Sequence, residues 1–264
     1  MAPNGTATLL RKQWSLHSKR NLQIAIAVVA TLLFVAPLLA VLFSAFRTTP
    51  FRGEWTLEAV RDVLLAGDTW SALGNSVMLA IASVVPAMLI AIVFAVLITR
   101  TNAFLKWLII ATMAILVATP PVFYAIAWGL LGNRTVGIIN VIARGGEQWG
   151  DGPFNIESWF GLILVSGLRA TGFMFLLLIG PFSQMDRSLE EAARVSGAGA
   201  VRTFFGTQLP TLMPAIVGVL IISTIVSIEA FDVPLFLGVP AGIYVLPTEV
   251  FAYLNDARQP MYGH

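Results

Sequence analysis

Five apolar stretches, each long enough to cross a bilayer as a helix, constrain the fold of this 264-residue chain more than any other feature. A membrane-spanning helix takes roughly 20 apolar residues. None of the stretches alternates polar and apolar residues as a barrel strand does, and lipid admits only helices or closed barrels. The sequence therefore predicts an all-α membrane protein, a polytopic helical bundle of about five spans. Their approximate ranges are 24–46, 75–98, 104–131, 159–182 and 211–228.

The composition agrees with a membrane protein and excludes several kinds of site. Hydrophobic residues make up 57% of the chain and charged residues 11%, against about 45–50% and about 25% in soluble domains. The chain has no cysteine, and its two histidines, His17 and His264, lie near opposite ends. We therefore expect no metal site, and the missing clusters of His, Asp or Glu argue against a membrane-embedded enzyme. A net charge of +2 without a basic block predicts no nucleic-acid partner.

Basic residues predict the orientation of the chain in the membrane. The segment before the first span has four basic residues and no acidic one, which places the N-terminus in the cytoplasm. The first span is too long for a cleavable signal peptide and should remain as an anchor. Alternation then places 132–158 outside, with a short surface helix, and places the tail after the fifth span outside as well. The cytoplasmic side receives 183–211 and the turn with Arg100 and Lys106. The four N-terminal basic residues are Arg11, Lys12, Lys19 and Arg20.

The polar stretch between the last two spans predicts two short helices. Ser188 and Glu191 have the spacing of a capping box, so a helix should begin at Ser188 and end near residue 196. Gly197 suits the left-handed position just past a helix end. A second helix should cover about 200–208, because Pro210 and Pro214 disfavour helical geometry in the residues before them.

Both predicted helices carry an apolar face that needs a partner. Helices of this length are unstable alone in water. Two interpretations remain open from the residues themselves. The stretch is either an interfacial hairpin, with its Phe residues in lipid and Glu191 serving only as a cap, or a docking surface for a protein. The apolar faces consist of Leu189, Ala192 and Ala193 in the first helix and of Val201, Phe204 and Phe205 in the second.

The same stretch resembles the EAA signature of permease subunits of binding-protein-dependent ATP-binding-cassette importers. The match consists of Glu191-Ala192-Ala193, then Gly197 after three intervening residues, and Leu209-Pro210. One position departs, since Thr207 replaces the usual aliphatic residue. The resemblance extends to Gly74-Asn75-Ser76, Arg100-Thr101, Phe231-Asp232-Val233-Pro234 and Val239-Pro240-Ala241-Gly242-Ile243.

The resemblance implies a type I importer permease fold, with 1–264 as one transmembrane domain of a bacterial inner membrane. It implies that 183–211 is a cytoplasmic coupling loop that docks on a separate ATPase dimer, with Glu191 in contact and Gly197 at the bend. ATP and magnesium would belong to that partner, and this chain has no Gly-rich nucleotide-binding loop of its own. The other implied partners are an external solute-binding protein, a second permease half that is fused or separate, and membrane lipid.

The later motifs resemble the ferric-iron branch of these permeases, with thiamine and polyamine importers close by. The stretches are Phe231–Gly238, which reads FDVPLFLG, and Pro240–Val245, which reads PAGIYV. Ferric iron is therefore the substrate that the sequence favours. Such a half normally has six spans, so we expect a chain truncated before the sixth, with an atypical five-span permease as the alternative.

Charged residues within or beside the spans have two interpretations. Arg169, Glu229 and Asp232 would line the translocation path, or Arg169 would pair with Glu229 inside the bundle while the acids lie at the outer interface. Pro120-Pro121 predicts a helix break or, alternatively, a gate. The rival function is an ion-coupled secondary transporter or channel, which would need polar groups in its spans, and this sequence has few.

Overall fold

The computed structural model describes residues 5–49, 52–102, 104–147 and 150–255. His264 lies outside the described residues. Contacts group the chain into two units, one of which covers 67–253. The other contains α1 (Gly5–Ala45), β1 (Arg47–Thr49), β2 (Arg52–Trp55) and α2 (Glu58–Leu65).

The first unit contains the first predicted span and a small hairpin. The part of α1 from Lys19 to Ala45 is long and apolar enough to cross a bilayer, and its large apolar side chains are exposed, as in a helix that faces lipid. Strands β1 and β2 pair antiparallel, and the Arg47 Cζ lies 4.7 Å from the centre of the Trp55 ring. Nothing in the sequence pattern predicts this hairpin, because such short strands show no clear alternation.

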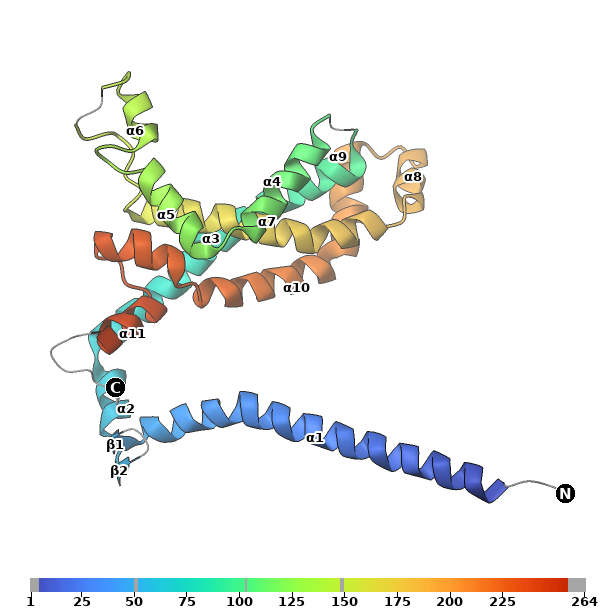
Figure 1. The fold of residues 1–264 in the computed structure, drawn as a ribbon. Helices are drawn as coiled ribbons and strands as arrows, with labels where there is room; N and C mark the ends of the chain where they lie inside the picture. The colour runs from blue at the N-terminus through green and yellow to red at the C-terminus, as the bar shows by residue number, and fades with distance from the viewer. Residues whose placement is uncertain (1–4, 50–51, 103, 148–149, 256–264) are drawn as a thin grey trace. The chain divides into compact units, whose positions relative to one another are not determined.

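Three long helices form the framework of the second unit (Figure 1). They are α3 (Gly67–Arg100), α7 (Trp159–Gln184) and α10 (Leu209–Ile228). Shorter helices complete it: α4 (Lys106–Ala118), α5 (Pro121–Leu131), α6 (Ile138–Ala143), α8 (Ser188–Val195), α9 (Ala200–Thr203) and α11 (Leu246–Asn255), with the π-helix Phe204–Gln208 between α9 and α10.

Small residues let α3 and α7 pack closely. The buried face of α3 is lined by alanines and serines, and such residues allow helix backbones to approach in a membrane. On α7, a Cβ placed at Gly167 would lie 3.2 Å from the Ser83 carbonyl oxygen. The small buried residues of α3 are Ala72, Ser76, Ala80, Ser83, Ala87, Ala91 and Ala95.

Gly167→Leu should lower the free energy of unfolding by about 1–3 kcal/mol, since the side chain must push α3 and α7 apart. Gly180→Leu, on the same helix, is the matched control, because a Cβ there meets nothing within 4 Å. Thermal unfolding of the purified chain in detergent measures both. Equal shifts for the two variants would contradict the close approach at Gly167.

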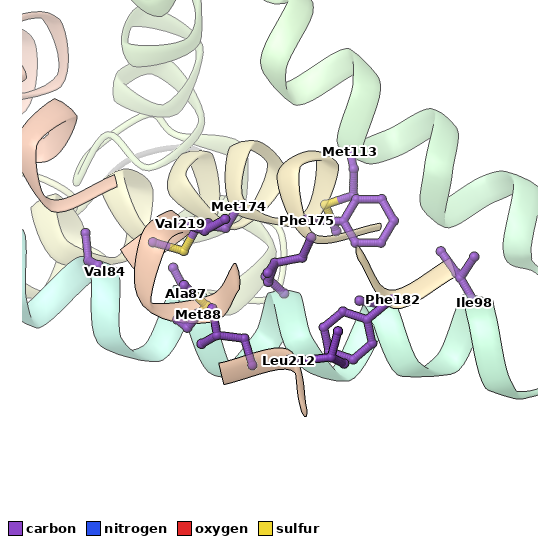
Figure 2. Packing of buried hydrophobic residues seen from close by; sticks show 14 of the residues in the cluster. Val84, Ala87, Met88, Ile98, Met113, Met174, Phe175, Phe182, Leu212 and Val219 are labelled. Carbon is purple, nitrogen blue, oxygen red and sulfur yellow. The ribbon is translucent and has the colours of Figure 1, made fainter. Parts of the chain in front are cut away.

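Larger apolar side chains fill the space between the framework helices. Figure 2 shows Met88 of α3, Phe175 and Phe182 of α7, Met113 of α4 and Leu212 of α10 in one cluster. All five are buried. This cluster joins the four helices into one packed body, which carries the loops at its two ends.

The structure corrects the third predicted span. The range 104–131 is not one straight helix: α4 and α5 meet at an angle of 108°. Thr119 and Pro120 have extended backbone between them, and Pro121 begins α5, where its missing N–H costs no helical bond. The helix break predicted at Pro120-Pro121 is confirmed, and the pair is a broken span or a re-entrant loop.

The structure also corrects the fifth span and the tail. No helix end precedes Pro210: α9, the π-helix and α10 run on as one candidate span from Ala200 to Ile228. The wider π turn ends at Gln208, two residues before Pro210, which cannot donate a helical hydrogen bond. Beyond it, the segment expected as an outer tail forms Pro234–Ala241 and α11, bent by 78° and apolar enough to be a sixth, broken span. The described residues therefore hold between four and six candidate spans.

Two loops lie at opposite ends of the second unit. Helix α6, within the loop predicted to be outside, lies at one end, and α8 and α9, predicted to be inside, lie at the other (Figure 1). The short helix expected in 132–158 is present as α6. The Asn140 side chain holds this loop by donating to Asn133 O and Phe154 O and accepting from Phe154 N–H. The arrangement suits loops on opposite faces of a membrane.

Candidate functional site

The start of α8 differs from the predicted capping box. Ser188 is the first helical residue, and the cap position is Arg187, whose side chain makes no cap hydrogen bond. Just before the helix, the Asp186 Oδ1 accepts from the Ser188 backbone N–H at 2.9 Å. This hydrogen bond lowers the pKa of the Asp186 carboxyl. Glu191 is exposed, and its carboxylate forms no ion pair among the described residues.

Gly197 forms the bend between α8 and α9, as its sequence position predicts. Its φ of 82° lies in the left-handed region, where a Cβ is strained in most residues. The Gly197 N–H donates to Arg194 O, and the Ala198 N–H donates to Ala193 O, which closes the end of α8. The bend thus fixes the direction in which the chain leaves α8.

A buried ion pair attaches α8 to the membrane helices. The Arg100 Nε, at the end of α3, lies 3.0 Å from the Glu190 Oε1, and the two side chains are 9% and 10% exposed. The same guanidinium donates to Phe182 O and Met185 O, at the end of α7. Arg100 therefore connects α3, α7 and α8 at one point. The sequence did not predict that Glu190 forms an ion pair. The only signal for it was Arg100 at the end of one span and two adjacent glutamates, Glu190 and Glu191, in the polar stretch before another.

Beside this ion pair, Glu191 lines a polar hollow of about 320 Å³ together with Lys106, Arg187 and Arg194. The residue is exposed there, one position away from buried Glu190. The two glutamates therefore lie on different surfaces: Glu190 faces the helix bundle, and Glu191 faces outward.

The predicted apolar faces of α8 and α9 are only partly free. Leu189 and Ala192 are exposed, whereas Ala193 is half-buried. Val201 and Phe205 are exposed, Phe205 by 62%. Phe204 is half-buried, and its ring lies edge-on to Phe205 with centroids 5.0 Å apart. The free part, hereafter the α8–α9 surface, consists of Leu189, Glu191, Ala192, Val201 and Phe205.

The remaining signature residues lie where α10 begins. Leu209 is half-buried against the main core cluster, and Pro210 is exposed. Thr207 is half-buried, and its carbonyl accepts from the Thr211 hydroxyl. Leu209 thus anchors the helix that continues from the α8–α9 surface into the bundle.

Arg169 faces a cavity of about 290 Å³ inside the second unit. Its Nη1 donates to Thr119 O at 3.1 Å and to Leu116 O at 3.4 Å, and its Cζ lies 5.7 Å from the centre of the Tyr124 ring. The arginine therefore caps the end of α4 at the 108° break. Other residues that line the cavity include Ser83, Ser166, Phe173, Ser223 and Ser227.

The structure does not bring the other two predicted path residues to this cavity. Glu229 is exposed and Asp232 half-buried, and neither lines it. Among the described residues, the ion pairs are Arg100–Glu190 and Arg134–Asp151, so the alternative pairing of Arg169 with Glu229 is wrong. Within the same part of the chain, no three His, Asp or Glu side chains form a group that could hold a metal ion.

Comparison with solved structures supports the architecture. A chain of a bacterial alginate ABC transporter, solved in complex with an alginate pentasaccharide-bound periplasmic protein, matches with a TM-score of 0.76. The match covers 98% of this chain and 89% of that one, at 16% sequence identity. At that identity the likeness establishes the fold alone, which is that of an ABC importer permease.

Sequence relatives come from sugar and glycerol-phosphate transport systems. The sulfoquinovosyl glycerol permease protein of Agrobacterium fabrum is 30% identical over 171 residues, 62% of this chain and 54% of the relative. The trehalose/maltose permease protein of Thermococcus litoralis is 29% identical, over 44% of this chain and 40% of its own length. The sn-glycerol-3-phosphate permease protein of Yersinia enterocolitica is 30% identical, over 41% of this chain and 37% of its own length. The chain thus spans about half the length, or less, of these curated relatives.

The family itself is established by a longer match. The model of the binding-protein-dependent transport system inner membrane component matches residues 69–258. This range includes α7, α10 and all but the first two residues of α3, together with the Arg169 cavity and the α8–α9 surface. The chain therefore belongs to the family of inner-membrane components of binding-protein-dependent transport systems.

Proposed function

We propose that this chain is a membrane-spanning subunit of an importer that passes a sugar-derived solute from an external binding protein to the cytoplasm. A separate ATPase dimer binds ATP and magnesium and acts through 183–211, and a second permease half completes the path. The observation that carries the proposal is the α8–α9 surface, which has exposed apolar side chains and a free carboxylate. It lies at the end of the unit opposite α6, attached to α3 and α7 by Arg100.

The relatives favour a sugar-derived substrate over ferric iron. Their names refer to a sulfoquinovosyl glycerol, a disaccharide and a glycerol phosphate. The ferric-iron expectation rested on Phe231–Gly238 and Pro240–Val245, and it has no support among these relatives. Uptake should therefore be measured for trehalose, sn-glycerol 3-phosphate and ferric citrate side by side, in cells that carry the whole importer.

Gly197→Val should abolish ATP-driven uptake while leaving the chain in the membrane. A β-branched side chain is strained at a φ of 82° and should turn α8 relative to α9. Gly197→Asn is the matched control, because asparagine tolerates this region. ATP hydrolysis and uptake are measured together in liposomes that contain all subunits. Full coupling in the valine variant, with normal assembly, would contradict the role of the bend.

The rival function, an ion-coupled secondary transporter or channel, makes a different prediction. Such a protein transports its solute without the ATPase subunit when an ion gradient is applied. The same liposomes, prepared with this chain alone and a sodium or proton gradient, separate the two functions. Uptake under these conditions would overturn the importer proposal.

A further inference from the structure

The Arg169 cavity has the charge of an anion-binding site. Among the described residues that line it, Arg169 is the one ionisable group. No acid forms an ion pair with its guanidinium in the part of the chain that the structure describes. The positive charge of Arg169 is instead stabilised by the carbonyls of Leu116 and Thr119 and by the face of the Tyr124 ring. A positive charge held by dipoles alone, among apolar walls, attracts an anion and repels a cation.

Hydroxyl groups in the same cavity lack partners. The Oγ atoms of Ser166 and Ser223 are buried, and neither has a hydrogen-bond partner among the described residues. Ser223 as a whole is 2% exposed. Buried hydroxyls are normally satisfied, so these two are available to a ligand with hydroxyl groups of its own. Ser166 and Arg169 belong to α7 and Ser223 belongs to α10, so the possible ligand contacts come from two helices that face the same cavity.

The size of the cavity restricts the ligand further. About 290 Å³ is near the lower end of the roughly 300–1,000 Å³ typical of ligand pockets. That volume suits a single sugar or a glycerol derivative rather than a polymer chain. Apolar side chains such as Phe173 and Val226 form other parts of the wall and suit the carbon skeleton of such a solute.

We infer that this cavity selects an anionic, hydroxyl-bearing solute, with Arg169 binding its phosphate, sulfonate or carboxylate group and Ser166 and Ser223 binding its hydroxyls. The inference rests on the proposed function, because it places the cavity on the path along which the solute is imported. It adds the charge of the substrate, which neither the fold nor the family determines. It also excludes a bare metal cation at this point of the path.

Direct binding to the purified chain tests the inference apart from import. The chain is placed in lipid nanodiscs, and binding is measured by calorimetry for two pairs of probes: sn-glycerol 3-phosphate against glycerol, and glucose 6-phosphate against glucose. We expect the phosphorylated probe of each pair to bind roughly tenfold to a hundredfold more tightly, as expected for a charge-assisted hydrogen bond. Arg169→Gln should remove this preference, and Arg169→Lys should keep part of it.

A purely structural arginine, which only caps α4, gives a different result. In that case both variants lose thermal stability and the preference for phosphate is unchanged, which overturns the inference. Arg144→Gln is the matched control, because Arg144 also donates to loop carbonyls, among them Thr135 O, but does not line the cavity. It should leave the preference intact. Ser223→Ala should lower the binding affinity of both probes of a pair by the same factor.

The outcomes also distinguish this inference from the proposed function. Wild-type binding without a phosphate preference, or no binding of any probe, overturns the inference even if ATP-driven uptake is observed. A phosphate preference that depends on Arg169 in a chain without ATP-driven uptake upholds the binding site and overturns the importer.

Discussion

Glu190→Ala should lower the free energy of unfolding by roughly 3–5 kcal/mol, the cost of leaving one charge of a buried ion pair without its partner. The Arg100 Nε has no hydrogen-bond partner among the described residues and depends on the Glu190 carboxylate 3.0 Å away. Without that carboxylate, the guanidinium keeps only its bonds to Phe182 O and Met185 O. Thermal and denaturant unfolding in detergent measures the loss.

A second ion pair in the same chain is the matched control. The Arg134 Nη2 lies 3.3 Å from the Asp151 Oδ2, with side chains 57% and 68% exposed. Exposed pairs contribute about 0–1 kcal/mol, so Asp151→Ala should have little effect. The double variant Arg100→Met with Glu190→Leu should recover much of the loss, since neither charge then remains buried alone. Equal losses of unfolding free energy for Glu190→Ala and Asp151→Ala would contradict this account of the buried pair. So would a double variant whose loss equals the sum of the two single losses.

Phe205→Asp should release the ATPase subunit during purification of the importer. The side chain is 62% exposed and is the one aromatic member of the α8–α9 surface, and aromatic anchors of this kind dominate binding energies. Phe204 is a poorer choice, because it is half-buried and its substitution would disturb the fold. The measurement is the amount of ATPase subunit recovered with the tagged chain.

The control for this variant is Ile142→Asp. Ile142 is also an exposed apolar residue, but it belongs to α6 at the opposite end of the unit (Figure 1). This variant should retain the ATPase subunit. Retention by both variants would show that Phe205 is not part of the docking surface, and loss by both would point to a general defect in folding.

The spans were predictable from sequence because lipid requires long apolar helices wherever the chain crosses it. The left-handed position of Gly197 was also predictable, since few residues other than glycine adopt it readily. The helix break at Pro120 followed from the same local rules, but its angle of 108° did not. That angle depends on how α4 and α5 pack on α7, which no local pattern records.

The errors have the same origin in tertiary structure. A proline normally ends a helix, yet the π turn before Pro210 lets the helix continue into α10. Glu190 and Glu191 are equivalent in a local pattern, and only the end of α3 determines that Glu190 turns inward to Arg100. Likewise, α8 begins at Ser188 itself, after the extended backbone at Met185, and not one residue later as the capping box predicts.

Site-specific cross-linking tests the central claim, that the α8–α9 surface docks an ATPase, most directly. The chain has no cysteine, so a single cysteine at Val201 reacts without background from the chain itself. Val201→Cys, treated with a photoactivated thiol cross-linker in membranes that carry the whole importer, should yield a covalent product with the ATPase subunit. Ile142→Cys should yield none. Absence of this product at Val201, with the importer assembled and active, would contradict the account.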